Sequence, residues 1–77
     1  SSAADLDAIV GSADPGEAVL VDFYATWCGP CRSMAPNVIA LSESGVRVAV
    51  VDVDLAPEAA MRFSVEALPT VIVFVDG

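Results

Sequence analysis

The feature that most constrains this chain is the segment "VLVDFYATWCGPCRSMAP", residues 19–36, in which an apolar run meets the only two cysteines. The run "AVLVDFYA" has the continuous apolar character of a strand that is buried on both faces of a sheet. From Cys31 to Ser44 the apolar residues recur at helical spacing, and Gly45 is a natural end for that helix. The two cysteines therefore lie at a junction between a strand and a helix.

The rest of the chain continues this alternation of helices and strands. The pattern predicts a helix within residues 2–10, a strand over 46–54, a short helix over 56–63 and a strand over 70–75. This order predicts an α/β fold, with a central sheet that is flanked by helices. The first two strands are expected to be parallel because a helix connects them, whereas the pattern does not fix the direction of the third.

Length and charge exclude several classes of protein. The 77 residues hold one domain, and its stability must come from the 56% apolar content, because cysteines three apart close too short a loop. The net charge of −8 argues against nucleic acid and membrane surfaces as partners. No apolar run approaches the ~20 residues of a membrane span, and no secretory signal is visible. A cytoplasmic location is therefore expected, with an organelle as a second possibility.

Three interpretations of Cys28 and Cys31 are open. A structural zinc site needs four ligands, usually Cys or His. This chain has two Cys and no His, so a second molecule would have to complete the site. Two inert buried thiols are the second interpretation, since Cys packs as a small apolar residue. The position between a strand and a helix favours the third, a redox pair.

A redox pair at the start of a helix gives its two thiols different roles. Cys28 faces free N–H groups and the positive end of the helix dipole, which lower the pKa of its thiol and make it the nucleophile. Cys31 is expected to be more buried and to resolve the mixed disulfide. Gly29 leaves room for a partner chain, and Pro30 starts the helix. Trp27 is interpreted either as core filling or as a half-exposed contact for substrates.

Asp22 stands in the first strand between Val21 and Phe23, whose apolar character suggests that this acid is buried. One interpretation is that its side chain points to an exposed face. The other is that burial raises the pKa of the carboxyl, which then accepts the proton of Cys31 when that thiol attacks. We favour the second, because buried acids with shifted pKa values cluster at functional sites.

The segments "VDFYATWCGPCRSMAP" and "VDVDLAPEAAMRFSVEALPT" resemble the active-site segment of the thioredoxin family and the segment that follows it there. The similarity covers about residues 17–77 and implies a thioredoxin-like fold. It also implies a protein disulfide reductase that contains a redox-active Cys28–Cys31 disulfide and no bound cofactor or metal. Its partners would be disulfide-containing proteins and a thioredoxin reductase. A rival hypothesis is a thioredoxin-like binding or scaffold module without turnover.

The resemblance gives further expectations for the site. Pro69, which from the residues alone marks a strand boundary, would be a cis-proline beside the active site. Leu68 would offer backbone hydrogen bonds to an extended substrate segment. Val50 stands where the family often has a Lys near the buried acid, so a higher pKa is expected for Asp22. Ser64 stands where a Gly often ends the preceding helix.

The resemblance also indicates that the domain, residues 1–77, is truncated. The family's first strand, and a strand and a helix after Gly77, are expected to be missing. The three remaining strands would leave two open sheet edges, and "TVIVFV" would be an exposed apolar edge strand. A dimer formed through these edges is therefore possible.

Overall fold

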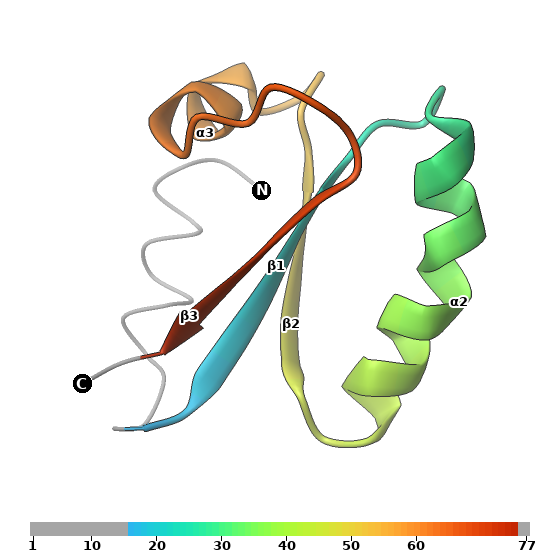
Figure 1. Cartoon of the computed structure of the whole chain (residues 1–77), viewed down its shortest axis with the longest axis vertical. Helices are drawn as coiled ribbons and strands as arrows, with labels where there is room; N and C mark the ends of the chain where they lie inside the picture. The colour runs from blue at the N-terminus through green and yellow to red at the C-terminus, as the bar shows by residue number, and fades with distance from the viewer. Residues whose placement is uncertain (1–15, 76–77) are drawn as a thin grey trace.

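The structure is a computed structural model that describes residues 16–75, which form a three-stranded sheet and two helices (Figure 1). The elements follow in the order β1 (Ala18–Tyr24), α2 (Gly29–Glu43), β2 (Arg47–Asp52), α3 (Pro57–Arg62) and β3 (Thr70–Val75). The predicted α/β fold is thus confirmed. The helix expected within residues 2–10 lies outside the described residues.

The strands are arranged in the order β2-β1-β3. β1 and β2 are parallel, as predicted, and Asp22 is the register partner of Val50. β3 is antiparallel to β1, with Val71 opposite Asp22. The short α3 stays at the end of the sheet where β2 finishes, so the chain re-enters the sheet from that end and β3 runs the other way (Figure 1).

The core lies on the face of the sheet that α3 covers. Phe23, Val21 and Val51 are fully buried there, and Ala59 of α3 packs against them. The ring of Phe63, directly after α3, lies 6.0 Å from the ring of Phe23 and 5.3 Å from that of Phe74. This packing fixes the position of the loop that leads from α3 into β3.

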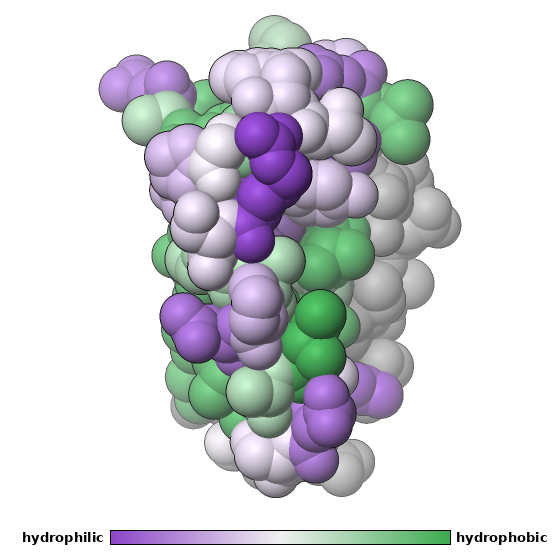
Figure 2. Space-filling view, turned by 90° about the vertical axis from the view of Figure 1, so that its right-hand side faces the viewer, coloured by the Kyte–Doolittle hydropathy of each residue, from purple (hydrophilic) through white to green (hydrophobic). Residues whose placement is uncertain are grey.

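The other face of the sheet lies toward α2 and carries exposed apolar side chains. Val71, Val73 and Val75 of β3 are 40%, 56% and 64% exposed, and Ile39 of α2 is 57% exposed. A view from the α2 side shows apolar areas among polar ones on this side of the molecule (Figure 2). The expected exposed apolar edge is therefore present at β3 in the described sheet. A dimer formed through it stays a prediction.

The predicted helix begins one residue before Pro30, which was expected to start it. Gly29 is its first residue and Cys28 is its N-cap, because the Cys28 Sγ accepts a hydrogen bond from the Cys31 N–H at 3.2 Å. The helix runs through Pro36 and ends at Glu43. The second strand and the short helix are each shorter than the predicted ranges, at Arg47–Asp52 and Pro57–Arg62.

Replacement of Ser64 by Gly is expected to raise the free energy of unfolding. Ser64 follows α3 with a φ of 55°, a left-handed conformation that favours Gly. A residue with a Cβ costs about 1–2 kcal/mol there, and the added freedom of Gly in the unfolded chain offsets about half, which leaves about 0.5–1 kcal/mol. Urea unfolding measures the change. Ser44→Gly is the control, because Ser44 has a φ of −81° and should lose stability; a gain at both positions would contradict the explanation.

Candidate active site

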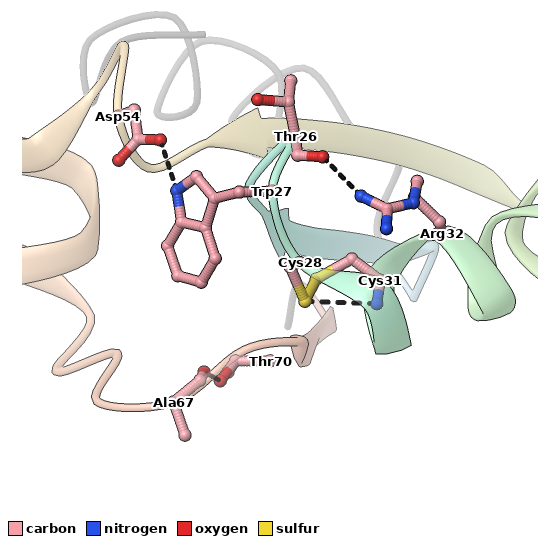
Figure 3. Close-up of a disulfide and its surroundings, with 8 residues drawn as sticks. All are labelled: Thr26, Trp27, Cys28, Cys31, Arg32, Asp54, Ala67 and Thr70. Atoms are coloured by element: carbon pink, nitrogen blue, oxygen red, sulfur yellow. Dashed lines mark hydrogen bonds between the residues drawn. A yellow bond between two sulfur atoms is a disulfide. The ribbon is translucent and has the colours of Figure 1, made fainter.

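Cys28 and Cys31 form a disulfide at the N-terminus of α2 (Figure 3). Their Cα atoms are 5.3 Å apart. The Sγ of Cys28 caps the helix, so it lies where free N–H groups and the helix dipole favour a negative charge. After reduction, this is the position at which a thiolate is stabilised.

The burial of the two cysteines differs from what the sequence predicts. Cys28 is 4% exposed and Cys31 is 6% exposed, so the expectation that Cys31 is the more buried is wrong for this disulfide form. The disulfide holds both residues in one small cluster with Ala25, against which Leu68 packs. Three residues next to the cysteines in the chain are exposed, namely Trp27, Pro30 and Arg32.

Trp27 does not fill the core. It is 67% exposed, and its indole N–H donates a hydrogen bond of 2.8 Å to the Asp54 carboxylate. Figure 3 shows the ring projecting toward Asp54 from a position beside the disulfide. This hydrogen bond fixes the direction of an exposed aromatic side chain next to the reactive sulfur atoms.

The loop before β3 reaches the same site. The Leu68–Pro69 peptide bond is cis, as the family resemblance implies, and both residues are half-buried. Leu68 packs against the cysteine cluster, and the Thr70 hydroxyl donates a hydrogen bond to the Ala67 carbonyl (Figure 3). The structure thus brings Leu68, which is 40 residues later in the sequence than Cys28, to the disulfide.

Asp22 is buried behind the pair, so the interpretation that it points to an exposed face is wrong. Asp22 is 6% exposed, and its Oδ1 has no hydrogen-bond partner among the described residues. Burial raises the pKa of the Asp22 carboxyl above its ordinary value, in the expected direction. Asp22 and Cys31 both line a cavity of about 460 Å³ between the sheet and α2, which Val50 also lines.

The stability of the protein should depend on the ionisation of Asp22. Because the folded state raises this pKa, the stabilisation by protonated Asp22 is complete below the ordinary value of 3.8 and is lost as the pH rises through the raised value. The free energy of unfolding of the wild type should therefore fall with rising pH relative to that of Asp22→Asn. Urea unfolding of both proteins, from below pH 3.8 to neutral pH, measures the difference between their free energies of unfolding. A difference that is independent of pH would contradict the raised pKa of Asp22.

The hydrogen bonds of Asp54 and Arg32 were not predicted from the sequence. Asp54 accepts a hydrogen bond from Trp27, which lies 27 residues earlier in the chain, and no local pattern links the two residues. Arg32 donates a 2.8 Å hydrogen bond to the Thr26 carbonyl, which ties the first turn of α2 to the loop before it. "VDVD" places an acid at position 54, the last residue of the strand predicted over 46–54, and this is the one signal that the sequence offers for it.

Residues 16–75 contain neither a cluster of metal ligands nor a helix that could cross a membrane. No group of three or more Cys, His, Asp or Glu side chains in this range could hold a metal ion. In the same range, neither helix has the length and apolar character that a membrane crossing requires.

The chain is similar to known thioredoxins. The Thioredoxin family model matches residues 2–77. Thioredoxin Asp f 28 of Aspergillus fumigatus is 51% identical over 61 residues, which are 77% of this chain and 56% of that protein. Thioredoxin Y1, chloroplastic, of Arabidopsis thaliana is 45% identical over 74 residues, which are 92% of this chain and 41% of that protein.

A solved structure gives the same result at the level of the fold. Fasciola hepatica thioredoxin matches with a TM-score of 0.91 and 46% identity, over 99% of this chain and 74% of that one. This chain spans about half the length of the two curated relatives above. Because the family model matches almost every residue, and because Leu68 packs against a disulfide at the start of α2, the chain belongs to the thioredoxin family.

Proposed function

We propose that this chain carries the active site of a protein disulfide reductase. The observation that carries the proposal is the Cys28–Cys31 disulfide at the N-terminus of α2, with exposed Trp27 beside it and Leu68 packed against it. An inert pair of thiols would not need an exposed aromatic neighbour. The redox-active disulfide itself is the only redox group that the proposal requires, and its reduced form delivers two electrons to a substrate disulfide.

The reaction has two exchange steps. The Cys28 thiolate attacks one sulfur of the substrate disulfide, which forms a mixed disulfide and releases the other substrate sulfur as a thiolate that takes a proton. Cys31 then loses its proton, and its thiolate attacks the Cys28 Sγ. The Cys28–Cys31 disulfide forms, and the second substrate sulfur leaves as a thiolate. The substrate is reduced by two electrons, and the pair is oxidised by two.

Asp22 is proposed to accept the proton of Cys31 in the second step. The support is that both side chains line the same cavity, and that the buried Asp22 Oδ1 has no other partner among the described residues. A carboxyl with a raised pKa is a stronger base than an ordinary one and suits this transfer near neutral pH. Asp22 therefore acts on Cys31, while Cys28 relies on the helix N-terminus.

Substrate binding is proposed at the rim around the disulfide. Trp27 lies on the α3 side of the pair, and Gly29 and Pro30 lie between the two cysteines. Leu68 packs against the pair, and Pro69 follows it in the chain. An extended substrate segment pairs with the backbone of Leu68. Disulfide-containing proteins and a thioredoxin reductase are the proposed partners. A cytoplasmic location stays a prediction, since one relative is chloroplastic by name.

Reduction of insulin disulfides tests the function. The whole protein that contains this chain is incubated with insulin and a dithiol as electron donor, and the precipitation of the insulin B chain is followed. A rate well above that of the dithiol alone is expected. A protein that is folded and whose cysteines oxidise and reduce, but that does not accelerate the reaction, would instead support the binding module without turnover.

A further inference from the structure

A second cavity, of about 250 Å³, lies on the α3 side of the disulfide. Its lining is apolar except for one acidic side chain, Glu66, and consists of Trp27, Val53, Ala60, Val65, Glu66, Ala67 and Leu68. The indole of Trp27 and the side chain of Leu68 give it surfaces on which hydrocarbon packs well. The cavity therefore combines an apolar floor with a single carboxylate.

This cavity is adjacent to the reactive sulfur atoms. Trp27 precedes Cys28 in the chain. Leu68 lines the cavity and also packs against the cluster of the two cysteines. Figure 3 shows Trp27 on one side of the disulfide and Ala67 below it. A substrate segment that forms a mixed disulfide with Cys28 thus has its neighbouring side chains within reach of this cavity.

Two acidic side chains, Glu66 and Asp54, adjoin the cavity or its Trp27 wall. Glu66 is exposed, and no ion pair within residues 16–75 involves it. On the far side of the Trp27 ring, Asp54 accepts the indole hydrogen bond. The chain as a whole has a net charge of −8. A positive group is therefore favoured at the mouth of the cavity, whereas an acidic group is repelled.

We propose that this cavity binds a lysine or arginine side chain of the substrate, close in sequence to the cysteine under attack, and that Glu66 determines this specificity. The aliphatic stem packs on Val53 and Val65, and the charged end reaches the Glu66 carboxylate. The face of Trp27 adds a cation–π contact. A purely apolar side chain would fill the floor but would leave Glu66 without a partner and partly desolvated. This inference rests on the proposed function, because it concerns the substrate of that same site.

Peptide binding tests the cavity separately from turnover. Peptides carry Ser in place of the reactive cysteine, so that no exchange occurs, and Lys, Gln or Glu at the neighbouring positions. Trp27 is the only tryptophan and lines the cavity, so its fluorescence reports binding directly. In the whole oxidised protein, the Lys peptide is expected to bind about fivefold more tightly than the Gln peptide, as for a favourable exposed charge pair, and the Glu peptide more weakly than either.

Two variants of Glu66 and one control assign the preference. Glu66→Gln should abolish the fivefold difference between the Lys and Gln peptides, and Glu66→Lys should make the Glu peptide the tightest. Glu43→Gln removes the same charge from the end of α2 that lies far from the disulfide (Figure 1). It should therefore keep the wild-type preference for the Lys peptide. This control separates the contact with Glu66 from the general attraction of a negative protein.

The outcomes distinguish the two proposals. Equal affinities for the three peptides in the wild type, no change of Trp27 fluorescence with any peptide, or an equal loss of preference in Glu66→Gln and Glu43→Gln would each overturn the cavity proposal. The cysteine-containing disulfide forms of the same peptides are then assayed for reduction. If none is reduced, the reductase proposal fails, whatever the result of the binding experiment.

Discussion

Replacement of Cys28 by Ser is expected to abolish the reduction of protein disulfides. A Ser hydroxyl at the start of α2 is not deprotonated near neutral pH and cannot attack sulfur, so turnover should fall by at least about 10³-fold, as is typical when a covalent nucleophile is lost. Replacement of Cys31 by Ser should also stop turnover, but after the first step. Cys28 still attacks in this variant, and the mixed disulfide then has no internal thiol to resolve it.

The two variants are compared under the same conditions. Each is mixed with a disulfide-containing protein, and the covalent complexes are counted on a non-reducing gel before and after treatment with excess dithiol. A trapped complex is expected for Cys31→Ser and none for Cys28→Ser. A trapped complex with Cys28→Ser alone would reverse the roles of the two cysteines, and turnover in either variant would contradict a two-cysteine reaction. Circular dichroism of both variants confirms that the fold is retained.

The local parts of the fold could be predicted because they depend on residues close together in the sequence. The apolar run around Phe23 and the helical spacing after Cys31 fixed the types of β1 and α2, and a connecting helix makes β1 and β2 parallel. The cis Leu68–Pro69 bond could be predicted only by resemblance to a family. A proline at the start of a strand gives the same local pattern whichever isomer is present.

The remaining features depend on contacts that a sequence pattern does not contain. The capping of α2 by the Cys28 sulfur was not predicted, because the usual N-cap residues are Ser, Thr, Asp and Asn. The hydrogen bond between Trp27 and Asp54 joins two loops that only the packed sheet brings together. Which acids face a cavity follows from the rotation of each element, so the position of Glu66 beside Trp27 could be found only in the structure.

Asp22 was the exception among the long-range features, since its neighbours alone indicated its burial. Val21 and Phe23 face the core on the α3 side, and Asp22 faces the opposite side because side chains alternate along a strand. That face is normally the exposed one in a sheet with a single covered side. Here α2 covers it, and the carboxyl is enclosed together with Cys31.

Replacement of Asp22 by Asn is therefore expected to slow the second exchange step by about a hundredfold near neutral pH, the lower range for the loss of a general base. The first step should change little, because the helix N-terminus activates Cys28. Rapid mixing of the reduced protein with a fluorescent disulfide peptide resolves the formation and decay of the mixed disulfide. Asp52→Asn is the matched control: Asp52 is also a buried acid, but it accepts the Asp54 N–H and does not line the cavity with Cys31.

The pH dependence of the second step shows whether Asp22 acts through its charge. Below its raised pKa the carboxyl is protonated and accepts no proton, so the rate in the wild type should fall as the pH falls through that pKa. In Asp22→Asn this decrease should be absent, because no group titrates at that position. A variant with the same rate and the same pH profile as the wild type would mean that solvent takes the proton of Cys31. The buried Asp22 would then be a cost to stability that the reaction does not use.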